Sequence, residues 1–95
     1  MSAMIEQAVA ALNARMDGGF DGSAKFVVED EGAIMIDEAG ARAGDGAADV
    51  TMTADADTFR SILDGDLNPT TAFMTGRLKV DGDMGQAMKL GSVLS

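Results

Sequence analysis

The most informative part of this chain is GDLNPTTAFMTGRLKVDGDMGQAMKLGSVL, residues 65–94. Asn68 can accept hydrogen bonds from free backbone N–H groups, which makes it a suitable helix cap. Pro69 suits the first helical position because its φ is already set and it has no N–H to leave unpaired. These two residues predict a short helix over 69–75, which Gly76 ends.

The same stretch continues with a strand and a second helix. Charged and apolar residues alternate over 77–81, which predicts a strand with Leu78 and Val80 facing inward. Asp83 is well placed to cap the following helix. Spacings of three and four residues put one set of small and apolar residues on a single face of that helix, namely Met84, Ala87, Met88 and Gly91. Helix, strand and helix therefore share one apolar side.

Upstream, the pattern changes between the helical and the strand period. An amphipathic helix is predicted over 2–16, with a stop at Gly18 and Gly19. A helix capped by Asp55 or Asp57 is expected to carry Phe59, Ile62 and Leu63 and to end at Gly65, a residue that tolerates left-handed backbone. Strands are predicted at 24–29, 33–36, 41–43 and 49–53, the third of them weak and at a sheet edge.

The order of these elements predicts the fold class. Strands joined by short turns favour antiparallel pairing, and helices placed before and after them favour cover on one face, which is an α+β arrangement. The 95 residues suit a single domain over 1–95 with one core, and 46% of them are hydrophobic, as in globular proteins.

The run LNPTTAFMTGRLKVDGDMGQAMKL, residues 67–90, resembles the signature segment of the sterol carrier protein 2 (SCP-2) lipid-binding domain family. The shared order is an Asn-Pro helix start, an Ala-Phe pair, a Gly-basic-Leu-Lys strand, a Gly-Asp-Met-Gly turn and an Ala-Met-Lys-Leu helix. The segment ADVTMT, residues 48–53, is similar to the fourth strand of that family. The resemblance implies a five-stranded sheet with helices on one face and an apolar tunnel between the two layers.

The resemblance also implies a function and a set of site residues. We expect non-catalytic binding, with possible transfer, of a fatty acid, acyl-CoA, phospholipid or sterol-like lipid. The tunnel wall is expected to comprise Phe59, Ile62, Leu63, Phe73, Met74, Leu78, Val80, Met84, Met88 and Leu90. Longer members of the family continue past the last helix, so one tunnel mouth is expected to lack a cover.

Composition excludes several other functions. The chain has no His and no Cys, which removes imidazole bases, thiolate nucleophiles and the usual zinc ligands, and we expect no enzyme activity, cofactor or metal. A net charge of −9 disfavours nucleic acid and allows at most transient contact with anionic membranes. The N-terminal residues lack the basic start of a secretory signal, so a cytoplasmic location is expected.

Two alternatives remain open from the residues alone. Eight methionines suit an adaptable ligand wall, but thioethers also fill gaps in ordinary cores, and spacing does not distinguish these roles. As a second hypothesis, the apolar C-terminal face could serve a protein-binding domain or a homodimer without a lipid. An enzyme that relies on paired carboxylates alone is a remote third candidate.

Overall fold

The protein is described here from a computed structural model that covers residues 3–16 and 19–94. The predicted helix start at Ser2 and the stop at Gly18 lie outside these residues. The elements, in chain order, are α1 (Ala3–Met16), β1 (Ala24–Val28), β2 (Gly32–Asp37), β3 (Gly40–Ala43), β4 (Val50–Ala54), α2 (Ala56–Leu63), α3 (Pro69–Met74), β5 (Lys79–Gly82) and α4 (Met84–Leu94).

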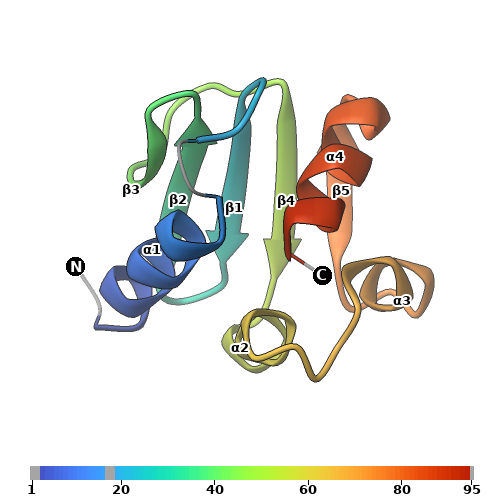
Figure 1. The fold of residues 1–95 in the computed structure, drawn as a ribbon. Helices are drawn as coiled ribbons and strands as arrows, with labels where there is room; N and C mark the ends of the chain where they lie inside the picture. Colours follow the sequence, from blue (N-terminus) through green and yellow to red (C-terminus); the bar gives the residue numbers. More distant parts are fainter. Residues whose placement is uncertain (1–2, 17–18, 95) are drawn as a thin grey trace.

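The five strands form one sheet in the order β3-β2-β1-β4-β5 (Figure 1). Strands β1, β2 and β3 make an antiparallel meander, and β5 is antiparallel to β4. Strand β4 returns beside β1 and pairs with it in parallel, with Phe26 opposite Met52. The expected α+β fold with a mostly antiparallel sheet is therefore confirmed, and the weak third strand lies at the expected edge.

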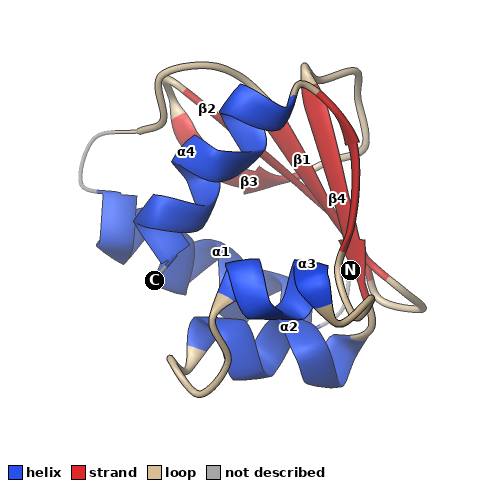
Figure 2. Ribbon diagram, turned by 90° about the vertical axis from the view of Figure 1, so that its right-hand side faces the viewer, coloured by secondary structure: helices blue, strands red, loops and turns tan. Residues whose placement is uncertain are grey.

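All four helices cover the same face of the sheet, as the view turned by 90° shows (Figure 2). Helix α1 packs against β2 and β3, whereas α4 packs across β1, β4 and β5. In β1 and β4, buried residues alternate with half-buried ones. Strands β1 and β4 both follow this alternation over five residues, which is the period expected for a sheet covered on one side.

The local signals at the helix ends act as predicted. The Asn68 side chain accepts hydrogen bonds from the backbone N–H groups of Thr70, at 2.8 Å, and Thr71, at 3.4 Å. Of the two candidates for the cap of α2, Asp55 is the cap, and it accepts from the Thr58 N–H at 2.7 Å. Gly65 follows α2 with φ of 83°, the left-handed backbone expected there.

Strand β5 begins two residues later than the alternating pattern predicted. The backbone N–H groups of Arg77 and Leu78 donate to the Ala72 carbonyl, at 2.9 and 3.1 Å, and so close the end of α3. A residue engaged in this turn is not available for the sheet ladder. Leu78 is nevertheless buried, as predicted.

Gly82 closes β5 in a position that requires glycine. Its φ is 111°, and a Cβ atom there would lie 2.5 Å from the Asp49 carbonyl oxygen. The close approach of the two backbones is therefore possible only without a side chain. This contact directs the chain from the sheet edge into α4, whose first turn is capped by Asp83 through the Gln86 N–H at 3.2 Å.

Candidate functional site

The candidate site lies where α3, β5 and α4 meet the end of β4. Helix α4 has two apolar faces. One face, with Leu90 and Leu94 buried, packs on the sheet, and the buried Ala87 lies at its border with the second face. The other carries Met84, Met88 and Gly91 at spacings of three and four residues, so these residues lie above one another on a neighbouring face.

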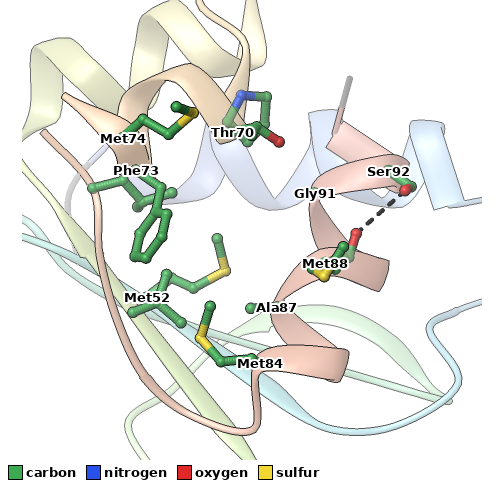
Figure 3. A pocket seen from close by; sticks show the side chains of 12 residues that line it. Met52, Thr70, Phe73, Met74, Met84, Ala87, Met88, Gly91 and Ser92 are labelled. Atoms are coloured by element: carbon green, nitrogen blue, oxygen red, sulfur yellow. Dashed lines mark hydrogen bonds between the residues drawn. The ribbon is translucent and has the colours of Figure 1, made fainter. Parts of the chain in front are cut away.

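This second face of α4 forms a pocket with α3 and β5 (Figure 3). The pocket has a volume of about 390 Å³. It is lined by Met52, Pro69, Thr70, Phe73, Met74, Leu78, Val80, Met84, Ala87, Met88, Gly91 and Ser92. Met52, Leu78 and Ala87 are buried, whereas Met74, Met84 and Met88 are exposed. The pocket therefore has a closed floor and a mouth open to solvent.

The lining contains no charged side chain. Its side-chain polar groups are the hydroxyls of Thr70 and Ser92, and the Ser92 Oγ donates to the Met88 carbonyl at 3.2 Å, as Figure 3 shows. Burying an ion in such surroundings is costly, whereas burying a hydrocarbon chain is favourable. The arrangement can therefore hold an apolar group but provides no acid or base at its floor.

The charged residues near α4 have structural roles outside the lining. Asp83 caps the helix, and the Lys89 ammonium lies 3.6 Å from the Asp21 carboxylate while also donating to the Asp21 carbonyl. Within the described ranges, no three His, Cys, Asp or Glu side chains are grouped so as to hold a metal ion. None of the described helices is long and apolar enough to span a bilayer.

Six of the ten residues predicted for the tunnel wall line this pocket, namely Phe73, Met74, Leu78, Val80, Met84 and Met88. The other four do not. Leu90 is buried against the sheet, because it lies about 160° around α4 from Met88 and packs on the core face. The pocket is open, and a closed tunnel between sheet and helices stays a prediction.

The three predicted residues of α2 also lie elsewhere. Phe59 and Ile62 are fully buried, and the Phe59 ring packs on Phe26 with 4.3 Å between ring centroids. Leu63 lines a separate pocket of about 270 Å³ between α1 and α2. The apolar face of α2 thus packs against the sheet and α1. Sequence periodicity identifies an apolar helix face but does not show which element that face will contact.

Six lining residues were not among the predicted wall residues. They are Met52, Pro69, Thr70, Ala87, Gly91 and Ser92. A periodic signal was present for several of them, since Ala87 and Gly91 share a helix face with Met84 and Met88. Thr70 precedes Phe73 by three residues and Ser92 follows Met88 by four, which are neighbouring positions on a helix surface. The small or polar side chains of Thr70, Ala87, Gly91 and Ser92 gave no reason to choose them.

A family model described as the SCP-2 sterol transfer family matches residues 5–95 of this chain. Hydroxysteroid dehydrogenase-like protein 2 of Xenopus tropicalis is 49% identical over 47 residues, which are 50% of this chain and 11% of that protein. The chain thus spans a small part of the length of this relative.

Two solved structures from Aedes aegypti share the fold. Sterol carrier protein 2 in complex with palmitate has a TM-score of 0.79 and 20% identity, covering 100% of this chain and 97% of that chain. Palmitated SCP2L2 has a TM-score of 0.70 and 25% identity, covering 99% of this chain and 95% of that chain. The likeness extends over the whole sheet and all the helices that form the pocket.

Proposed function

Since this chain belongs to the SCP-2 sterol transfer family, we propose that it binds a lipid by enclosing its apolar chain in the pocket between α3, β5 and α4. The observation that carries this proposal is an apolar pocket without a charged side chain, with buried methionine, leucine and alanine at its floor. Each methylene moved from water into such a floor contributes about 0.8 kcal/mol to binding.

The size and opening of the pocket favour a single-chain lipid. Small-molecule sites in proteins range from about 300 to 1,000 Å³, so a volume of about 390 Å³ lies at the lower end. The open mouth leaves room for a polar head group in water, beside the hydroxyls of Thr70 and Ser92. Palmitate, which is present in two structures of the same fold, is therefore a suitable first probe.

We propose that the chain binds without catalysis. The relative from Xenopus tropicalis is named as a dehydrogenase-like protein, but it is matched over 11% of its length. The pocket lining has no carboxylate or amine, and the whole sequence has no His or Cys to act as a base or nucleophile. The lining offers only apolar surface and two hydroxyl groups. These groups can bind a ligand but cannot act as a general acid or base near neutral pH.

Native mass spectrometry of the delipidated protein tests this function. The protein is mixed with palmitate, a fatty acyl-CoA, a single-chain phospholipid and a sterol, and the added mass per chain is measured. We expect one single-chain lipid per protein molecule. If the protein binds none of the four ligands although circular dichroism shows it to be folded, the proposed function is wrong.

A protein-binding or dimerisation role is the second candidate. The exposed side chains at the pocket mouth favour it, because Phe73, Met74, Met84 and Met88 are large apolar residues exposed around one pocket. A mass that doubles with concentration, without any bound lipid, would support this role. Loss of the dimer on addition of palmitate would instead show that lipid and partner compete for the same surface.

Three other expectations from the sequence stay predictions. They are a single domain over residues 1–95, a cytoplasmic location, and transfer of lipid with at most transient membrane contact. Light scattering after incubation with neutral and anionic vesicles would measure the last of these. The net charge of −9 predicts weaker contact with the anionic vesicles.

A further inference from the structure

The methionines of this chain are distributed unevenly over its surface. In the part of the chain that the structure describes, three methionine side chains are exposed, and all three lie at the mouth of the pocket. Met74 is 78% exposed, Met88 is 72% exposed and Met84 is 46% exposed. They come from α3 and α4, and Figure 3 shows them around Phe73 and Met52.

The remaining described methionines are shielded. Met52 lines the same pocket but is 2% exposed, and Met35 is 8% exposed beneath the loop whose Gly46 N–H donates to its Sδ at 3.3 Å. Met4 and Met16 on α1 are half-buried. Solvent access governs how readily a thioether meets a dissolved oxidant, so the pocket mouth carries the most accessible sulfur atoms in the described structure.

We infer that Met74, Met84 and Met88 form a site of preferential oxidation by peroxide-class oxidants, and that their oxidation weakens binding of an apolar ligand in the pocket. In this reaction, a lone pair of the thioether sulfur attacks one peroxide oxygen. The S–O bond forms as the O–O bond breaks, and the departing hydroxide takes the proton of the hydroxyl now bound to sulfur, which leaves a sulfoxide and water. The sulfur loses two electrons and the peroxide gains them.

The expected consequence follows from the change in polarity. A methionine sulfoxide is polar and accepts hydrogen bonds from water, so covering it with a hydrocarbon chain requires its desolvation. The three residues are part of the pocket lining, and a ligand chain that enters the pocket must contact them. Oxidation therefore lowers affinity for the ligand, whereas the fold is preserved because these side chains are exposed and contribute little to the core.

The first measurement locates the oxidation. The full chain is treated with limiting hydrogen peroxide, digested, and the sulfoxide at each methionine is quantified by mass spectrometry over time. We expect Met74 and Met88 to react first and Met84 next, with Met52 and Met35 protected until the protein unfolds. Equal rates at all five positions in the folded protein would overturn the proposed site.

The second measurement concerns binding, and this part rests on the proposed function. The dissociation constant of palmitate is measured before and after peroxide treatment. We expect it to rise about tenfold for the wild-type chain. The triple variant M74L/M84L/M88L conserves apolar volume, and its dissociation constant should not change on treatment, whatever its starting value. The control variant M4L/M16L should respond like the wild type.

The outcomes distinguish this inference from the proposed function. If no untreated protein binds palmitate or another single-chain lipid, the proposed function fails, while the order of sulfoxide formation still tests the oxidation site. If the untreated chain binds palmitate and the oxidised chain binds it equally well, the lipid function stands and the effect of oxidation is refuted. An equal loss of binding in the triple variant would also refute it.

Discussion

Two phenylalanines show how different roles arise for the same residue type. Phe59 is fully buried and packs on Phe26, whereas Phe73 is 43% exposed and lines the pocket. Both follow a capped helix start, and both were predicted as wall residues. The residue type therefore indicates an apolar environment but does not indicate whether the neighbour is the core or a ligand.

This contrast gives a test with a matched pair of substitutions. We expect Phe59→Ala to lower the free energy of unfolding by about 3–5 kcal/mol, because it leaves a cavity in the core. Phe73→Ala should lower the free energy of unfolding by about 1 kcal/mol or less, since the side chain is partly exposed. It should also raise the dissociation constant of palmitate about tenfold. Urea unfolding and lipid titration measure the two effects. A Phe73→Ala variant that binds as tightly as the wild type would remove this residue from the wall.

At the scale of the element, α4 determines the shape of the site. It presents a core face and a pocket face, and Gly91 lies on the pocket face opposite Pro69. A Cβ atom at Gly91 would lie 3.9 Å from the Pro69 Cβ, which is an ordinary contact. The position therefore has room for a methyl group, and a larger side chain would extend into the pocket.

Substitutions at Gly91 should consequently separate stability from binding. Gly91→Ala is expected to stabilise the protein by about 0.5–1 kcal/mol, since glycine is a poor helix former. Gly91→Leu should occupy the pocket and abolish palmitate uptake while the protein stays folded. Ala10→Leu, on the exposed face of α1, controls for the added hydrophobic volume. Normal uptake by Gly91→Leu would place the ligand outside this pocket.

The cap of α2 makes part of the stability of this element depend on pH. The hydrogen bond from the Thr58 N–H holds the pKa of Asp55 below its ordinary value of 3.8. Because the pKa is lower in the folded state, this stabilisation is present above the ordinary pKa and is lost as the pH falls through the folded pKa. Asparagine also caps helices but does not titrate in this range.

We therefore expect the melting temperature of the wild-type chain to fall more steeply below about pH 4 than that of Asp55→Asn. Thermal melts followed by circular dichroism over a range of pH measure the difference between the two curves. Other carboxylates, such as Asp37, are common to both proteins and cancel in the comparison. Parallel curves would show that the cap contributes no pH dependence.

At the scale of the whole molecule, the pocket results from bringing β4 and β5 beside helices that come later in the chain. Met52 on β4 forms part of the floor, and it lies opposite Val80 on the paired strand β5. The floor is limited in depth by the sheet beneath it. A ligand chain therefore gains contacts as it lengthens until the pocket is full.

A series of saturated fatty acids of increasing length tests this picture of the molecule. Each additional methylene should tighten binding about fourfold while the chain still enters the pocket, and the affinity should then level off. Competition against a fluorescent fatty acid provides the dissociation constants. The affinity of the Gly91→Leu variant should depend little on the length of the fatty acid. If the affinity of the wild type does not change with the length of the fatty acid, burial of the acyl chain is contradicted.

The sequence by itself determined the local elements of this protein. Asn68, Asp83 and the glycine at position 65 act through nearest neighbours along the chain, so their roles as caps and stops were readable without a fold. The alternation in the strands likewise reports burial on one side. The face of α4 that carries Met84 and Met88 was predicted because helical periodicity is also a local property.

Only the tertiary structure decided which apolar faces meet each other. It placed β4 parallel to β1, packed Phe59 and Leu90 into the core, and left the mouth formed by Met74 and Met88 open to solvent. The physical reason is that hydrophobic burial is non-directional and carries no information about the partner. Long-range packing assigns the partner, and thereby separates a side chain that fills the core from one that lines a pocket.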